Sequence, residues 1–263
     1  MAREPRPNRY LLLLERIFER QWTVGASEFE FERADLIRVA EELDIKLPKN
    51  LGDVIYAPRY RIGLPDGIRA TQPAGLEWII EGAGRARYKF RLAKVTRIVP
   101  RTDMAVVAIP DATPQLIRAY ALDDEQALLA IVRYNRLVDT FLGLTTYSLQ
   151  NHLRTTVQGV GQIEIDELYV GIDRYGCHYV IPVQAKGGTE HIGVVQTTQD
   201  VRFAEQKYPG MRCRAIAAQF IDNGVVALFE LTLQDGDVKV VDERHYKLVP
   251  HSDLDASAIR NYR

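Results

Sequence analysis

The chain has 263 residues, enough for one large domain or two modest ones with a buried core. Hydrophobic residues make up 46% and charged residues 26%, an ordinary globular composition that excludes an intrinsically disordered chain. Because 34 Lys and Arg residues oppose 35 Asp and Glu residues, the formal charge is −1, and the whole-chain charge gives no sign of a polyanionic partner.

Neither the cysteines nor the N-terminus indicates secretion or membrane insertion. Cys177 and Cys213 lie in no CxxC or zinc-type spacing, which is typical of a protein with reduced thiols. The apolar run at residues 11–14 is too short for the core of a signal peptide and far too short for a membrane span. We therefore expect a soluble cytoplasmic protein without membrane contact.

The first hundred residues predict helices followed by a β-hairpin. Apolar residues at helical spacing predict helices over residues 10–20, about 32–43, and a short stretch through 54–56 that Asn50 caps. Alternating runs at 76–81 and 87–92, separated by a glycine-containing turn, predict the hairpin. Three helices and a basic hairpin is the order of winged-helix DNA-binding modules, although other small α+β folds share it.

Positive charge is concentrated between residues 51 and 101, where ten Lys and Arg residues oppose four Asp and Glu residues. Within 85–91 the cations alternate with small or aromatic residues, so a period of two puts four of them on one strand face. Such a face can neutralise phosphates, and the alternative is a solvated outer face of an ordinary hairpin. The candidate DNA-binding residues are Arg59, Arg61, Arg85, Arg87, Lys89 and Arg91.

Three prolines between residues 100 and 114 predict a linker, which divides the chain into domains 1–105 and 106–263. The elements expected in the second domain are a helix over 127–141 behind an acidic first turn, a short helix over 147–155, a hairpin within 161–188, a helix beginning at about 192–196, strands on both sides of a turn at 222–224, and a last strand at 244–249.

The hairpin within 161–188 carries the most informative pattern. On its first strand the apolar phase changes at Asp166 and Glu167, which indicates a local irregularity of the kind that re-aims side chains near sites. Counting back from the turn places Asp166 one step from Gln184, and Gln184 shares a strand face with Lys186. We expect an acid, an amide and an ammonium group to converge there.

This combination suits phosphodiester hydrolysis. A hard divalent cation prefers oxygen ligands, which Asp166 and the amide oxygen of Gln184 can supply. The cation would activate water and neutralise charge on the phosphate, while Lys186 orients the water or stabilises the same charge. The first strand offers three acids; we favour Asp166 as the metal ligand, with Glu164 and Glu167 as rivals.

The segment resembles the PD-(D/E)XK nuclease superfamily through Glu-Ile-Asp at residues 164–166 and Gln-Ala-Lys at 184–186. The resemblance covers about residues 123–250. It implies a restriction-endonuclease-like α/β/α core with a mixed sheet, so the expected fold class is α+β, with a winged-helix-like DNA-recognition domain preceding this core.

The resemblance also implies roles for individual residues. Asp166 takes the role of metal ligand, Gln184 that of second ligand, and Lys186 that of catalytic lysine. Some nuclease families place a supporting glutamine on the helix after the lysine, and Gln196 is the candidate. Gln184 departs from the Asp or Glu of most families, a change found in active members and also in inactive ones.

The expected activity is therefore that of a Mg²⁺- or Mn²⁺-dependent endonuclease of a restriction or other defence system, acting on double-stranded DNA. Nucleases of this architecture often form homodimers, although nothing in the sequence indicates the interface. The alternative is a non-catalytic DNA-binding protein in which Gln184 marks a degenerate site. RNA is a further substrate that the Arg and Lys content does not exclude.

Overall fold

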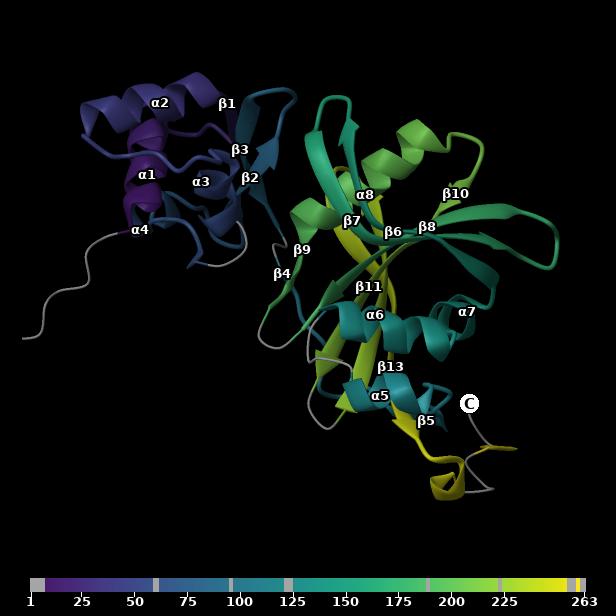
Figure 1. The fold of residues 1–263 in the computed structure, drawn as a ribbon. Coiled ribbons are helices and arrows are strands. Elements are labelled where there is room, and N and C mark those ends of the chain that lie inside the picture. The colour runs from purple at the N-terminus through teal and green to yellow at the C-terminus, as the bar shows by residue number, and fades with distance from the viewer. Residues whose placement is uncertain are drawn as a thin grey trace, which may run out of the picture. The chain divides into compact units, whose positions relative to one another are not determined.

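The computed structural model describes residues 8–58, 62–94, 97–120, 125–187, 190–221, 224–254 and 259–260. It has a mixed α+β fold (Figure 1). The chain divides into two compact units, one formed by Met1–Thr96 and Thr156–Gln162 and the other by Arg97–Thr155 and Ile163–Arg263. The domain boundary expected after residue 105 therefore lies inside the second unit.

In the described residues, the first unit combines helices α1 to α4 with a three-stranded sheet. Its elements are α1 (Arg9–Gln21), β1 (Glu28–Glu32), α2 (Arg33–Glu42), α3 (Gly52–Ala57), α4 (Asp66–Arg69), β2 (Glu77–Gly82) and β3 (Arg87–Ala93). The sheet is antiparallel with the order β1-β3-β2. The three expected helices and the hairpin are confirmed, and the Asn50 side chain accepts a hydrogen bond from the Gly52 N–H at 3.1 Å.

Aromatic side chains fill the core of the first unit. Phe90 of β3 is completely buried, and its ring centroid lies 5.1–5.3 Å from those of Phe18, Phe29 and Phe31. The apolar side of α1 is buried as expected. On α2 the apolar residues Leu36, Val39 and Ala40 are buried, whereas Ile37 is 40% exposed.

The remaining chain is built around a large sheet. Its elements are β4 (Arg97–Ile98), β5 (Val106–Pro110), α5 (Gln115–Tyr120), α6 (Glu125–Tyr134), α7 (Leu137–Leu142), β6 (Thr145–Val157), β7 (Gly161–Ile172), β8 (His178–Lys186), β9 (Ile192–Gly193), α8 (Val194–Lys207), β10 (Arg212–Cys213), β11 (Ala215–Ile221), β12 (Val225–Gln234), β13 (Asp237–Val249) and a 3₁₀ turn (His251–Asp253). The strand order is β5-β13-β12-β11-β8-β7-β6, with β10 beside β8 and a separate β4-β9 ribbon.

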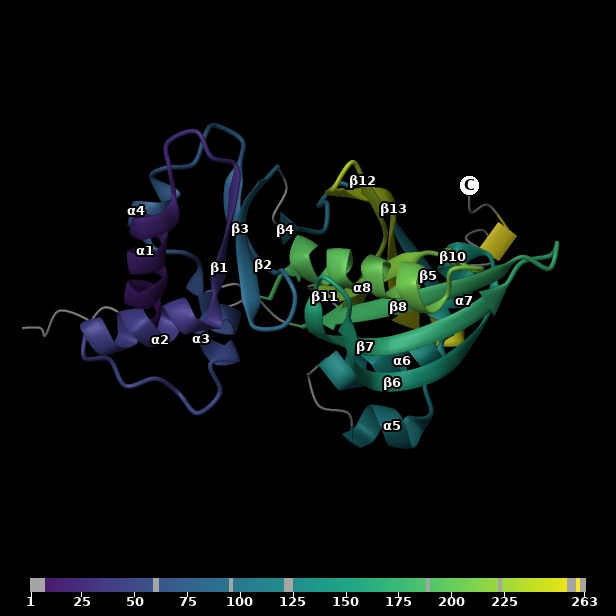
Figure 2. The same ribbon diagram turned by 90° about the horizontal axis from the view of Figure 1, so that it is seen from above.

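This sheet is mixed and lies between two layers of helices. The pair β8-β11 is parallel, whereas β7-β8 and β11-β12 are antiparallel. Helices α6 and α7 cover one face and α8 covers the other, as Figures 1 and 2 show. On β8, Ile181, Val183 and Ala185 belong to the core under α6 and α7, so the residues between them face α8.

Three expectations for this part of the chain are wrong. Residues 147–155 lie within strand β6 rather than a helix, because pairing with β7 overrides a weak local helical signal. The linker expected at 100–114 contains β5, which pairs in parallel with β13. The single helix expected over 127–141 is two helices, α6 and α7, separated at Arg136, whose φ is +48°.

The other expected strands are confirmed, although β13 begins well before residue 244. Cys177 and Cys213 are both free thiols. Across the described ranges, no helix combines the length and the apolar character needed to cross a membrane.

Replacing Phe90 with Ala tests the aromatic core. We expect Phe90→Ala to lower the free energy of unfolding of the first unit by about 4 kcal/mol, because it leaves a cavity among three rings. Both tryptophans of the chain, Trp22 and Trp78, lie in this unit, so urea denaturation followed by tryptophan fluorescence reports on it selectively. Val24→Ala, at a side chain 91% exposed, is the control and should change the value by less than about 0.5 kcal/mol. Equal midpoints for the two variants would contradict this description of the core.

Candidate functional site

The β7-β8 hairpin positions the acid, the amide and the ammonium group as neighbours. In this hairpin Ile172 pairs with His178 next to the turn, and Glu167 pairs with Val183 at the far end. Asp166 is the next residue of β7 beyond the Glu167 pair. One Asp166 carboxylate oxygen accepts a hydrogen bond from the Ala185 N–H at 2.9 Å. Asp166 is thus held beside the segment that carries Gln184 and Lys186.

The two rival acids of β7 have partners elsewhere. Glu164 accepts a hydrogen bond from Arg154 Nε at 3.1 Å on the neighbouring strand β6. Glu167 is completely buried on the α6 side, where its Oε1 accepts from Arg133 Nε at 2.8 Å and from Ser148 Oγ at 2.5 Å. Asp166 and Glu164 are two residues apart and share a strand face, whereas Glu167 lies on the opposite face. Asp166 is distinguished by its carboxylate, which bonds the backbone of β8 between Gln184 and Lys186.

Asp166 lies in surroundings that disfavour its charge. The residue is only 9% exposed, and burial raises the pKa of its carboxyl from 3.8 to about 6, against the opposing effects of the Ala185 N–H and the Lys186 charge. Burial likewise raises the pKa of Asp200 on α8 well above its usual range, and the nearby Asp166 charge adds to this rise. Two buried acids that interact unfavourably when ionised favour a proton or a cation between them.

Gln184 is oriented by its nitrogen. Its Nε2 donates to both carboxylate oxygens of Asp200, at 3.0 and 3.2 Å, and to the Glu164 carbonyl oxygen at 3.2 Å. Its Oε1 is buried and has no hydrogen-bond partner among the residues that the structure describes. A buried acceptor of this kind needs an explanation, and a bound water or ion is one.

Asp200 was missed in the sequence, although a signal for it exists. It lies on the buried side of α8 together with Val194, Thr197, Val201 and Ala204, so it is an acid on the apolar side of a helix. The expected supporting residue, Gln196, is half-buried one turn earlier on α8, while the contact to Gln184 comes from Asp200.

Lys186 is held as a buried cation. Its Nζ donates to Glu125 Oε1 at 2.6 Å and lies 3.7 Å from a carboxylate oxygen of Glu190. Burial opposes the charge, but the hydrogen bond and charge of Glu125 outweigh it and raise the pKa of Lys186 above its ordinary value. In the sequence Glu125 served only as a helix-start signal; its role beside Lys186 follows from the position of α6.

The donors at this site fit a hard cation but do not form a complete cage. Among the residues that the structure describes, no three His, Cys, Asp or Glu side chains form a group able to hold a metal. The Asp166 carboxylate and the unpartnered Gln184 Oε1 are oxygen donors of the type preferred by Mg²⁺, which usually keeps several waters and binds substrate phosphate as well.

The cations of β3 form ion pairs with glutamates of the neighbouring strands. The register aligns β1 glutamates with the cations of β3 on one face of the sheet. Lys89 lies 3.2 Å from Glu28, and Arg87 lies 3.5 Å from Glu30. A glutamate of β2 likewise holds Arg91 at 2.7 Å. The basic face expected from alternation is therefore a face of compensated ion pairs.

The other candidate DNA contacts differ in position. Arg85 lies in the turn before β3 rather than on the strand, and it is exposed. Ala86 has φ +59°, so the alternation expected through 85–91 is interrupted there. Arg59 and Arg61 lie outside the described residues. Four cations therefore do not share one strand face.

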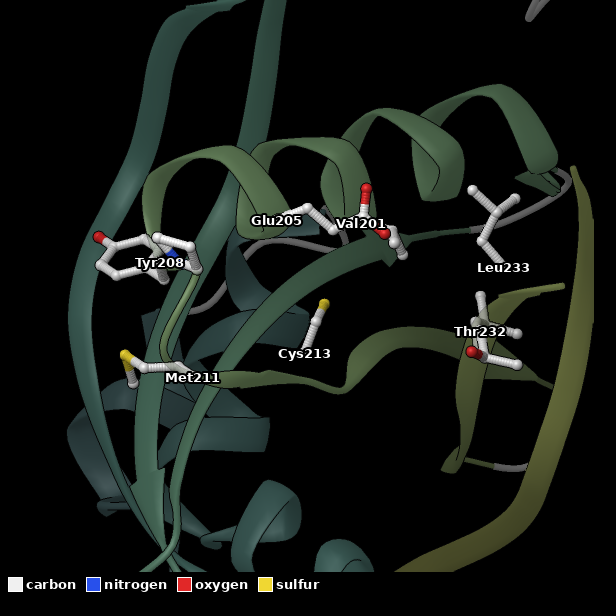
Figure 3. A pocket seen from close by; sticks show the side chains of 9 residues that line it. Val201, Glu205, Tyr208, Met211, Cys213, Thr232 and Leu233 are labelled. Carbon is white, nitrogen blue, oxygen red and sulfur yellow. The ribbon is translucent and has the colours of Figure 1, made fainter.

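A separate pocket of about 350 Å³ lies between the C-terminal half of α8, β10 and β12 (Figure 3). Its lining residues are Val201, Glu205, Tyr208, Pro209, Met211, Cys213, Leu231, Thr232 and Leu233. Burial raises the pKa of Cys213 to about 12, so this thiol stays protonated and is a poor nucleophile. Asp166, Gln184 and Lys186 of the hairpin site do not line this pocket.

Comparison of the chain with protein-family models, with curated proteins and with solved structures finds no match. The assignment of a function therefore depends on the chemistry of the site itself.

The buried state of Asp166 has a measurable effect on stability. Because its pKa is raised from 3.8 to about 6, the folded protein keeps a proton that the unfolded chain releases, and the free energy of unfolding falls as the pH rises through this range. Asp166→Asn removes this contribution, so the variant should gain on the order of 3 kcal/mol relative to the unaltered protein between about pH 4 and pH 7. Urea denaturation in EDTA measures the difference.

The control is Asp103→Asn, an exposed acid whose pKa is held below its usual value by its hydrogen bond to Arg101. That variant should lose stability toward neutral pH relative to the unaltered protein, the opposite sign. If the Asp166→Asn difference is independent of pH, Asp166 does not have the raised pKa described above.

Proposed function

We propose that the protein is a Mg²⁺- or Mn²⁺-dependent endonuclease that hydrolyses phosphodiester bonds in DNA, as part of a restriction or other defence system. The observation that carries the proposal is the unpartnered, buried Gln184 Oε1 on the same strand face as Lys186 and beside Asp166. An acid, an oriented amide oxygen and a buried ammonium group are the set expected for this reaction.

The architecture supports the same proposal. A mixed sheet between two helical layers, with the candidate residues on one hairpin and a following helix, agrees with the restriction-endonuclease-like core that the sequence resemblance implies. In the first unit, helices followed by an antiparallel hairpin agree with a winged-helix-like module. We propose that this unit contacts DNA.

Asp166 and Gln184 would hold the divalent cation. The chemistry that the ion supplies when bound is activation of water and neutralisation of charge on the phosphate. Asp166 is prepared for this role because burial makes its ionised form costly until a positive charge is present. Asp200 accepts from the Gln184 Nε2 and so fixes the orientation of the amide, which leaves Oε1 as the oxygen available to the cation.

Lys186 supplies fixed positive charge. Its ammonium group is held by Glu125 and remains protonated in a buried setting, where a charge interacts more strongly with a phosphate than it does in water. The Lys186 hydrogen bond to Glu125 uses one of the three N–H donors, which leaves donors for the water or the phosphate oxygen. Positioning and charge stabilisation are the roles that this residue can perform.

Replacing Lys186 with Ala tests the catalytic assignment. We expect Lys186→Ala to reduce the cleavage rate of plasmid DNA with Mg²⁺ by at least about 100-fold, because fixed positive charge at the reacting phosphate is lost. DNA affinity measured with Ca²⁺ should change little. Lys207→Ala, at an exposed lysine in the last turn of α8, is the control and should cleave at the normal rate.

The same assay decides between the substrates. Total RNA is incubated in parallel, and EDTA replaces Mg²⁺ in a matched set. Cleavage of RNA alone would make the protein a ribonuclease, and DNA binding without any cleavage would favour the non-catalytic alternative with a degenerate Gln184. Full activity of Lys186→Ala would overturn the assignment of the site.

Metal binding can be measured without cleavage. We expect MgCl₂ to raise the thermal midpoint of the unaltered protein at alkaline pH, since an ion that binds only the folded state stabilises it. Asp166→Asn should lose this increase. Glu164→Gln is the matched control and should keep it, because the Glu164 carboxylate is engaged with Arg154. Loss of the increase in Glu164→Gln alone would move the metal to the rival acid.

A further inference from the structure

Gln219 lies directly beside Lys186 in the sheet. The residue is on β11, and the parallel register with β8 pairs Gln219 with Lys186 and Ala217 with Gln184. Paired residues of neighbouring strands point to the same face, with their backbones about 4.8 Å apart. Gln219 therefore shares the face that carries the amide and the lysine of the candidate site.

The Gln219 side chain is buried and oriented. It is 5% exposed, and its Nε2 donates to the Glu190 carbonyl oxygen at 2.9 Å. Turning the amide over would bring its oxygen against that carbonyl oxygen, so the observed orientation is the favourable one. The Oε1 is buried, and none of the described residues provides it with a hydrogen-bond partner.

Two oriented amide oxygens thus lie on one sheet face around Lys186. Gln184 Oε1 and Gln219 Oε1 are both buried acceptors without partners in the described part of the chain. Ala217, the β11 residue beside Gln184, contributes only a methyl group between them. A water molecule held in a buried site needs two to four polar partners, and the Lys186 ammonium group and the Gln219 oxygen provide a donor and an acceptor on adjacent strands.

We propose that Gln219 is a further catalytic residue, whose Oε1 accepts a hydrogen bond from the attacking water beside Lys186. This inference rests on the proposed hydrolysis of phosphodiesters. In that reaction the water oxygen forms a bond to phosphorus, the bond from phosphorus to the leaving oxygen breaks, and the proton released by the water is balanced by protonation of the leaving group from solvent. Nothing is oxidised or reduced.

Gln219 acts by orientation and takes no proton. An acceptor that engages one O–H of the water fixes the direction of its lone pair, and placing a nucleophile correctly makes a large contribution to the rate. The Nε2 bond to Glu190 has a second effect, because it holds the segment after Lys186 in place. The test must separate the role of Oε1 as an acceptor from the role of the Nε2 hydrogen bond, which we call the clamp.

Two variants make that separation. Gln219→Met keeps the length of the side chain but removes both the acceptor and the donor. Gln219→Glu keeps an acceptor oxygen in either protonation state and, when ionised, loses the donor to Glu190. We expect Gln219→Met to lower kcat roughly 100-fold and Gln219→Glu to stay within about 10-fold of the unaltered protein at alkaline pH.

Both variants are compared with Gln234→Met, an exposed glutamine at the end of β12, which should leave cleavage unchanged. DNA affinity with Ca²⁺ and the thermal midpoint should be similar in all three variants, so that the loss lies in kcat rather than in binding or folding. Equal losses in Gln219→Met and Gln219→Glu would reduce Gln219 to a clamp and overturn the proposal.

The outcomes also separate this inference from the function on which it rests. If the unaltered protein cleaves, Lys186→Ala does not and Gln219→Met cleaves at the normal rate, only the role of Gln219 is wrong. If the unaltered protein cleaves neither DNA nor RNA with Mg²⁺ or Mn²⁺, both proposals are overturned.

Discussion

The second unit depends on polar groups placed in a strand that is buried on both faces. Every residue of β8 after His178 is buried, yet two of them are an amide and a lysine on the face toward α8. Such groups are costly inside a protein unless each finds a partner. Their partners come from α6, α8, β7 and the segment after β8, so the polar side chains of one strand tie together elements far apart in the sequence. Among the described residues, the amide oxygens of Gln184 on β8 and Gln219 on β11 have no partner, and for this reason we propose roles for both in binding.

Neighbouring side chains decide where charge is balanced. Three acids occur within four residues of β7: Glu164 pairs with Arg154 of β6, Glu167 pairs with Arg133 of α6, and Asp166 lies beside the segment of β8 that carries the lysine. On β3 the strand register aligns cations with glutamates of the neighbouring strands. These ion pairs compensate the positive charge that a local count of residues suggests, and an exposed pair such as Arg87 with Glu30 adds little stability. Charge in a segment is therefore a poor guide to charge on a surface.

The secondary structure was predictable wherever the signal is local. Helical spacing and turn residues identified α1, α2, both hairpins and the strands that follow α8, because these patterns depend on residues close together in the chain. The misassigned segments are those whose structure depends on distant partners: β5 pairs with β13, and β6 adopts its strand on the edge of the large sheet. Strand β1 was not predicted either, although its alternating Glu and Phe residues are a local signal for a strand.

For the candidate site, the sequence by itself determined a hairpin with Asp166 on one strand and Gln184 and Lys186 on the other, because strand period and turn position are local properties. Only the tertiary structure decided which acid faces the lysine and which groups surround it. Glu125, Asp200 and Gln219 come from a preceding helix, a following helix and a later strand, and no spacing rule links them to the hairpin. They meet because the sheet order and the two helical layers bring them to one face, where burial makes a polar side chain costly unless another polar group lies within reach.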